Sequence, residues 1–196
     1  MRPLFASKLL SPAAPVGCGL LSADAGTALT ELVQSVNSKA VAEIDSYYGL
    51  GNTPVLGRAV GPDGVLAYVD LWNHHGAREK AHFVANVACN GIADRIPPLR
   101  MWSTEAARMF LSGAFDKVFI DGSHSCECVS ADIPARLPPV RMGGFLCDDD
   151  YDRGDYSVAA VVNRVFPAAE VIAKCLWVHR VVLDNRERRT SNLVSP

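Results

Sequence analysis

Carboxylate side chains stand at the C-terminal end of nearly every short apolar segment of this sequence. The carboxylates, each with the segment that it closes, are Glu43 and Asp45 (39–44), Asp70 (65–69), Asp121 (117–120) and Asp148–Asp150 (144–147). Carboxylates hold divalent cations, attract cationic ligands and bind the hydroxyl groups of a ribose. Any one of them also suits a turn or a helix cap. Their repetition favours a shared site.

The elements around these residues alternate between short apolar strands and amphipathic helices. We expect helices at 24–37, up to about 59, 76–90, 104–112, 126–136 and 155–166, with extended segments at 39–44, 65–69, 99–102, 117–120 and 144–147. The stretch 170–184 is β-rich, which indicates a closing hairpin or paired edge strands. This alternation predicts a doubly wound, Rossmann-like α/β fold, with a mostly parallel sheet, helices on both faces and an antiparallel C-terminal hairpin. The carboxyl ends of parallel strands meet at one edge, where such sheets bind ligands.

The length of 196 residues suits one domain over 1–196. We divide it into an N-terminal segment and helix (1–37), a core sheet (38–184) and a tail (185–196). The net charge of −2 argues against nucleic acid as a partner, and no apolar run is long enough for a membrane span. The six cysteines lack a C-x-x-C pair and are expected to be reduced thiols. We therefore expect a cytoplasmic protein.

The loop after the first strand points to a nucleoside. Glycines in the segment 43–53 allow the backbone to approach a ligand closely. Asp70 lies 21 residues after Gly49, about where an acid would hold both hydroxyls of a ribose. The G-x-G-x-x-G pattern of dinucleotide binding is absent, and Glu43 and Asp45 would repel a pyrophosphate but attract an ammonium or a sulfonium. These features favour S-adenosylmethionine (SAM) over a nicotinamide cofactor.

The acidic residues further along the chain predict a metal site. Asp121 stands at one strand end, and Asp149 and Asp150 stand at its neighbour's end, so all three can converge on Mg²⁺ or another divalent cation. The alternative is a solvated acidic turn without metal. His124, three residues after Asp121, suits a general base for a hydroxyl group. It could equally bond the cofactor or cap the next helix.

Four motifs in order resemble those of class I SAM-dependent methyltransferases. They are V-A-E-I-D-S-Y-Y-G-L-G-N-T (41–53), A-Y-V-D-L-W (67–72), F-I-D-G-S-H (119–124) followed by V-S-A-D-I (129–133), and M-G-G-F-L-C-D-D-D-Y (142–151). The last two are similar to the F-I-D-G-x-H and G-G…D-D-Y motifs of a small bacterial O-methyltransferase-like branch. The resemblance covers about residues 38–167.

The resemblance implies roles for particular residues. Glu43, Ser46, Tyr48 and Gly49 would line the methionine side of the cofactor, Asp70 would bind the ribose, Leu71 and Trp72 would lie against the adenine, and Ser103 would lie at its edge. Asp121 would border the cofactor and act in catalysis with His124, and in metal-dependent members the positions of Asp121, Asp149 and Asp150 hold a cation that binds the acceptor hydroxyl. Asp45 departs from the pattern, because the family usually has a glycine there. Its side chain could crowd the methionine moiety.

These observations lead to a main hypothesis and two alternatives. The first is an enzyme that moves a methyl group from SAM to a hydroxyl oxygen of a small molecule with Mg²⁺ assistance. The second, motivated by Asp45, is a degenerate or non-catalytic nucleoside-binding module. The third is a nicotinamide-dependent oxidoreductase. The acceptor is not named by the sequence, and the β-rich C-terminal edge makes a homodimer plausible.

Overall fold

The computed structural model describes residues 21–74, 76, 78–93, 98–151, 157–173 and 175–182. The helices are α1 (Ala23–Ser35), α2 (Asn52–Ala59), α3 (Glu79–Cys89), α4 (Ser103–Met109), α5 (Cys126–Arg136) and α6 (Val158–Val165). The strands are β1 (Ala40–Ile44), β2 (Val65–Asp70), β3 (Leu99–Arg100), β4 (Phe115–Ile120), β5 (Val140–Asp148), β6 (Glu170–Ile172) and β7 (Leu176–Arg180). Residues 1–20, with Cys18, and the predicted tail 185–196 lie outside the described residues.

The strands form one seven-stranded sheet in the order β3-β2-β1-β4-β5-β7-β6. The pairings among β1 to β5 are parallel. β7 runs antiparallel to both β5 and β6, so the last two strands form a hairpin of which β7 is the inner member. The predicted fold class is therefore confirmed. The hairpin adds the antiparallel end that the β-rich stretch predicted.

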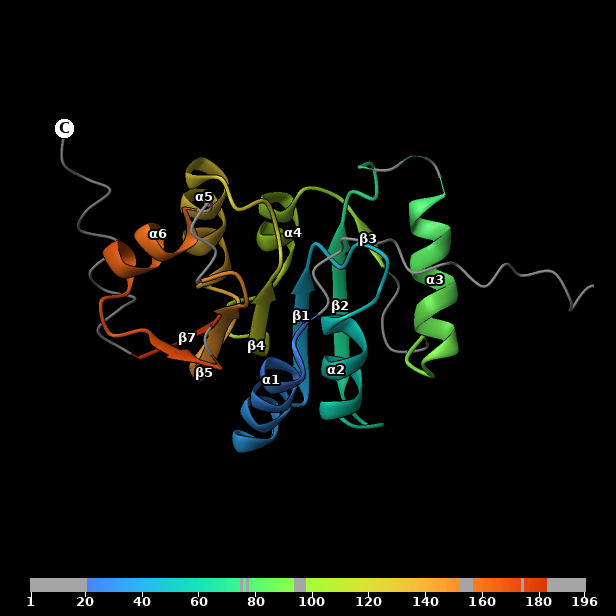
Figure 1. Cartoon of the computed structure of the whole chain (residues 1–196), viewed down its shortest axis with the longest axis horizontal. Helices are drawn as coiled ribbons and strands as arrows, with labels where there is room; N and C mark the ends of the chain where they lie inside the picture. Colours follow the sequence, from blue (N-terminus) through green and yellow to red (C-terminus); the bar gives the residue numbers. More distant parts are fainter. Residues whose placement is uncertain are drawn as a thin grey trace, which may run out of the picture.

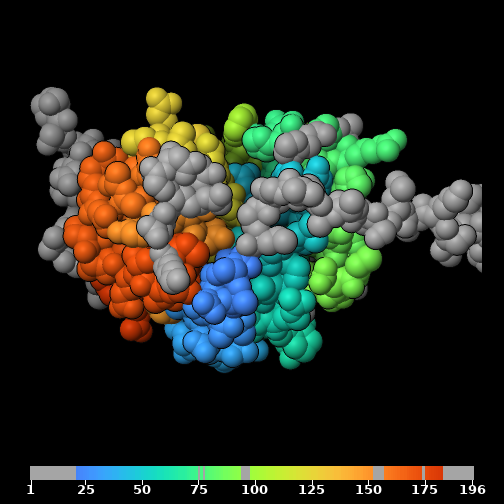
Figure 2. Space-filling model, viewed as in Figure 1, coloured from blue at the N-terminus to red at the C-terminus, as the bar shows by residue number. Residues whose placement is uncertain are grey.

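Helices cover both faces of the sheet because strand residues alternate between two hydrophobic cores. On one face, Leu29 of α1, Leu56 of α2 and Phe83 of α3 share a core with Leu66 and Tyr68 of β2. On the other face, α4, α5 and α6 pack against the residues of β2 that alternate with these two, Ala67 and Val69. Figure 1 shows α1 and α2 side by side in front of the sheet. The space-filling view in Figure 2 shows that their side chains cover the lower part of that face.

Some boundaries differ from the prediction for local physical reasons. β5 begins at Val140 rather than at Gly144, and Gly143 has a φ of +77°, where the register against β4 also shifts. α4 ends at Met109 because Phe110 is already extended. α6 begins at Val158, and part of the predicted start of this helix (155–156) lies outside the described residues.

Two further expectations concern cysteines and membranes. Among the described residues, the cysteines Cys89, Cys126, Cys128, Cys147 and Cys175 are all free thiols. Within the same part of the chain, no helix combines the length and the apolar character needed to cross a bilayer.

Candidate active site

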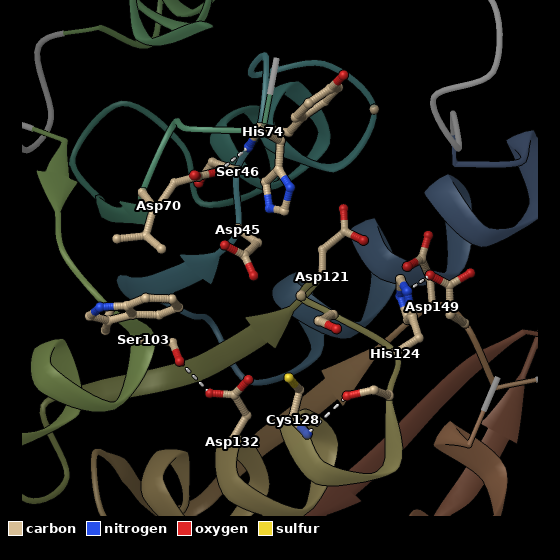
Figure 3. A pocket seen from close by; sticks show the side chains of 18 of the residues that line it. Asp45, Ser46, Asp70, His74, Ser103, Asp121, His124, Cys128, Asp132 and Asp149 are labelled. Carbon is tan, nitrogen blue, oxygen red and sulfur yellow. Dashed lines mark hydrogen bonds and ion pairs between the residues drawn. The ribbon is translucent and has the colours of Figure 1, made fainter. Parts of the chain in front are cut away.

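A large pocket lies at the carboxyl ends of the parallel strands. The strand order reverses between β1 and β4, and open α/β sheets bind ligands at such a reversal. The pocket has a volume of about 1430 Å³, and the loops that follow β1 to β5 line it. The site residues predicted from the sequence that line it are Asp45, Ser46, Asp70, Leu71, Ser103, Asp121, His124, Asp149 and Asp150. Figure 3 shows how the labelled side chains, among them Asp45, Asp70 and Asp121, lie around one space.

The loop after β1 brings Asp45 and Ser46 into the pocket. Asp45 has a φ of +61°, and its backbone N–H donates to the carbonyl of Val69 at 2.7 Å. Burial raises the pKa of Asp45 to about 7, and the negative charges of Asp70 and Asp132 act in the same direction. This loop therefore presents a carboxyl group whose charge depends on what binds beside it.

Three other predicted residues, one in β1 and two in this loop, do not line the pocket. Glu43 is buried within the sheet, where it accepts a hydrogen bond from Oγ1 of Thr53 at 2.7 Å. Burial raises the pKa of Glu43 to about 8. Tyr48 and Gly49 face α3: Asn86 donates to the carbonyl of Tyr48, and a Cβ on Gly49 would lie 2.9 Å from the ring of Phe83. Their positions behind the pocket wall let them shape the loop.

The structure brings residues of the same loop into the pocket that sequence reasoning missed. They are Tyr47, Leu50 and Gly51. Tyr47 has a φ of +47°, and its ring lies against that of its neighbour Tyr48, with 4.0 Å between the ring centroids. The sequence carries two adjacent tyrosines, and only the backbone conformation decides which of them lines the pocket.

Asp70, at the end of β2, is the acceptor around which the first two loops are organised. It accepts hydrogen bonds from the backbone N–H groups of Tyr47 at 2.7 Å and Trp72 at 2.6 Å. Burial raises its pKa, and these two bonds partly offset that rise. Leu71 lines the pocket beside it, but Trp72 does not. The Trp72 side chain is 1% exposed and contacts Phe83 in the core, so it lies behind the wall rather than in the predicted position against an adenine.

Opposite Asp70, the loop after β3 and helix α5 form the next wall. Ser103 lines the pocket as predicted and donates to Oδ1 of Asp132 at 2.5 Å, the bond drawn in Figure 3. Asp132 also lies 3.8 Å from the guanidinium of Arg136, which is almost fully buried. Trp102, which the sequence analysis did not single out, lines this wall with its side chain 60% exposed.

The carboxyl ends of β4 and β5 contribute a compact cluster of titratable groups. Ligand atoms of Asp121, His124 and Asp150 all lie within 4.8 Å of one another. Nε2 of His124 pairs with Oδ2 of Asp150, and Asn52 donates to Asp121 at 2.9 Å. Asp149 instead groups with Asp148 and Asp150. The predicted metal set of Asp121, Asp149 and Asp150 is therefore divided between two overlapping groups, and His124 joins the first.

The electrostatics of this cluster are those of crowded negative charge. Burial raises the pKa of Asp121 well above its ordinary range, and the charges of Asp149 and Asp148 raise it further. Burial alone would lower the pKa of His124, but its bond to Asp150 and the surrounding aspartates outweigh burial and raise it. Carboxylate oxygens are the donors that Mg²⁺ prefers, and a cation would relieve their mutual repulsion. The donor set therefore fits a divalent cation.

Comparison with known proteins identifies the family of the chain that forms this pocket. A family model described as "Methyltransferase domain" matches residues 42–151, more than half of the chain. The chain belongs to this methyltransferase family. The matched segment runs from β1 to the end of β5, so it contains the pocket-lining residues of the first two loops and the acidic cluster of the methyltransferase. No curated protein matches it significantly in sequence.

Solved structures share the fold of this methyltransferase at low sequence identity. A cofactor-bound protein from MTB is 22% identical, with a TM-score of 0.63 over 80% of this chain and 79% of its own. The O-methyltransferase TomG from Streptomyces achromogenes, in complex with SAM, is 17% identical, with a TM-score of 0.63 over 83% and 82%. An O-methyltransferase from Bacillus cereus, in complex with SAH (S-adenosylhomocysteine), is 17% identical, with a TM-score of 0.61 over 80% of each chain.

Proposed function

We propose that this methyltransferase transfers a methyl group from SAM to a hydroxyl oxygen of a small molecule, with a divalent cation such as Mg²⁺ assisting. The observation that carries the proposal is the division of one pocket into two halves. Asp70 and the first two loops form one half, and the cluster of Asp121, His124 and Asp150 forms the other. A methyl donor and its acceptor need adjacent sites of this kind, because the transfer requires the reacting atoms to be held in line.

The half around Asp70 suits the nucleoside part of SAM. Asp70 stands at the end of the strand next to the switch point, where an acid binds the hydroxyls of a ribose. Leu71 and Ser103 line the walls on either side, where they would contact the adenine and its edge. Two structural neighbours, which are in complex with SAM and SAH, support this assignment.

The other half suits the acceptor. Asp121 and Asp150, with Asp149 adjacent, would hold the cation. When bound, the cation would supply a positive charge that lowers the pKa of the acceptor hydroxyl. In its neutral form, the imidazole of His124, which pairs with Asp150, would receive the hydroxyl proton. In the transfer, the oxygen forms a bond to the methyl carbon while the bond from that carbon to sulfur breaks, and the electron pair stays on sulfur.

One observation favours a second candidate, a nucleoside-binding module without turnover. Asp45 places a carboxyl group in the pocket at a left-handed backbone position that favours glycine. If this side chain excluded the methionine part of SAM, the pocket would not hold the methyl donor productively.

Isothermal titration calorimetry with SAM and SAH tests the proposal directly. We expect dissociation constants in the micromolar range for the wild-type chain. Binding of neither compound would overturn the proposed function. An increase in NADH fluorescence on mixing with the protein, in contrast, would favour an oxidoreductase. Methyl transfer to a panel of sugar, phenol and other small hydroxyl compounds then separates an active enzyme from a binding module.

A further inference from the structure

Asp45 has a backbone conformation that the proposed reaction does not by itself require. Its φ of +61° lies in the left-handed region, which is unfavourable for a residue with a Cβ, although aspartate tolerates it better than most residues. Backbone outliers of this kind concentrate at functional sites, because the surrounding structure must compensate for their cost. The position of the Asp45 side chain indicates what function this unfavourable conformation has.

The carboxylate of Asp45 is held over the start of the loop after β4. Its Oδ2 lies 2.7 Å from the position that a Cβ on Gly122 would take, so the carboxylate in this position packs closely over the backbone of Gly122. The hydrogen bond from the Asp45 N–H to Val69 fixes the residue between β1 and β2. In Figure 3, Asp45 lies between Asp70 and Asp121, and its carboxylate points into the pocket.

The charges around Asp45 leave this part of the pocket negative. Asp70 and Asp132 act against ionisation of Asp45, whereas Arg136 and His124 favour it. Both of these cations already pair with other carboxylates, Arg136 with Asp132 and His124 with Asp150. The carboxylate of Asp45 would therefore bind a cationic ligand atom beside it more strongly than a neutral one.

We propose that Asp45 lies beside the sulfonium of SAM and makes the pocket prefer SAM over its demethylated product. The inference rests on the proposed function and deepens it. In SAM the sulfur is bonded to the ribose carbon C5′ and carries the methyl group, so it lies between the ribose and the acceptor. Asp45 occupies the corresponding place between Asp70 and Asp121. SAH keeps the ammonium and carboxylate of SAM but has a neutral sulfur, so a carboxylate at that atom distinguishes the two.

Asp45→Asn tests this charge effect with little change in size. Asparagine also tolerates a left-handed backbone, so the variant keeps the loop conformation. Calorimetry at about pH 8 should show SAM binding weakened about tenfold or more, which corresponds to about 1.4 kcal/mol. SAH binding should change by less than about threefold. An amine analogue of SAM, in which an ammonium-bearing carbon replaces the methylsulfonium, should weaken as SAM does.

Two further variants separate charge from other effects. Asp63→Asn removes the same charge from an exposed turn between α2 and β2, and it should leave both affinities unchanged. Asp45→Gly removes charge and volume together, and it should also lower the ratio of SAM to SAH affinity. Equal weakening of SAM and SAH in Asp45→Asn would overturn the proposal, because it would place Asp45 at the shared ammonium. Stronger binding of both ligands in Asp45→Gly at an unchanged ratio would overturn it in favour of steric crowding.

The failure of the inference is distinguishable from failure of the proposed function. A wild-type chain that binds neither SAM nor SAH overturns both. A wild-type chain that binds both ligands, with a ratio that Asp45→Asn does not change, overturns only the role of Asp45.

Discussion

Glu43 shows how a single buried carboxyl group couples this sheet to pH. Its side chain is 1% exposed, and burial holds its pKa at about 8, against an ordinary value of 4.5. Between these two values the folded protein binds the proton of Glu43 more tightly than the unfolded chain does. Folding stability from this group is therefore complete at low pH and is lost as the pH rises toward 8.

We predict that Glu43→Gln reduces this pH dependence. The amide keeps an oxygen that can accept the hydrogen bond of Thr53 but has no charge to bury. Urea unfolding measures the free energy of unfolding at about pH 5 and pH 8. Between these two pH values, the wild type should lose at least about 1 kcal/mol more of this free energy than the variant. Glu105→Gln, on the exposed side of α4, is the matched control and should behave as the wild type. Parallel pH profiles of Glu43→Gln and wild type would contradict the prediction.

Asp70→Asn tests the proposed ribose contact. An asparagine oxygen can accept one of the two backbone hydrogen bonds that Asp70 now accepts, but its amide lacks the charge that strengthens bonds to the ribose hydroxyls. We expect SAM and SAH to bind about tenfold more weakly, and by the same factor. Calorimetry measures both, and circular dichroism checks the fold. Undiminished affinity in a folded variant would exclude Asp70 from the ribose site.

At the scale of residues, the sequence was most informative where chemistry and strand position agree. Asp70, Asp121 and Asp150 line the pocket because each follows a buried strand at the same sheet edge. Trp72 could not be placed in this way. The left-handed backbone of Trp72 directs its apolar ring into the core, and a positive φ at one residue cannot be predicted from the periodicity of the sequence.

At the scale of elements, the close approach of β4 and β5 predicts a strong glycine requirement. A Cβ on Gly144 would lie 2.4 Å from the carbonyl oxygen of Asp116, which is main chain and cannot rotate away. We expect Gly144→Ala to destabilise the protein by about 2 kcal/mol or more. Gly26→Ala in α1 meets only ordinary contacts and should be neutral or stabilising by up to about 1 kcal/mol. Chemical denaturation of the two variants compares them, and equal stabilities would contradict the prediction.

The order of the elements followed from the sequence, but two details of their pairing did not. Alternation of apolar strands with helices predicted the parallel strands and the C-terminal hairpin. The early start of β5 was missed because Arg141, Met142 and Gly143 break the apolar run, although a register shift still lets the backbone pair. In the sheet, β7 lies between β5 and β6 because β7, not β6, pairs with β5. The composition of the two hairpin strands does not indicate which of them pairs with β5.

At the scale of the whole molecule, a net charge of −2 conceals an uneven distribution. The acidic residues that line the pocket gather at one end of the sheet, where burial raises the pKa of Asp121 and of its neighbour Asp148. Repulsion among them costs folding free energy, and a divalent cation would reduce that cost.

Magnesium should therefore stabilise the folded protein. At a free concentration of about ten times its dissociation constant, one bound ion adds about 1.4 kcal/mol, which raises Tm by about 3 °C in a chain of this length. Differential scanning fluorimetry measures the shift against sodium chloride of equal ionic strength. Asp121→Asn should abolish the difference between the salts. The same Tm in both salts for the wild-type chain would argue against a specific cation site.

The inner position of β7 also affects how the chain is made. During synthesis β5 emerges before β7, and its outer edge then has unpaired backbone N–H and C=O groups. Unpaired strand edges are templates for association with other chains. The ribosome must release residues 176–180 before β7 can cover that edge. A nascent chain that is halted after β6 therefore has all of its parallel strands, but the edge of β5 is free to pair with a strand of another chain. Translation pauses or early stop codons in this short interval would therefore lead to aggregation rather than to a merely shortened enzyme.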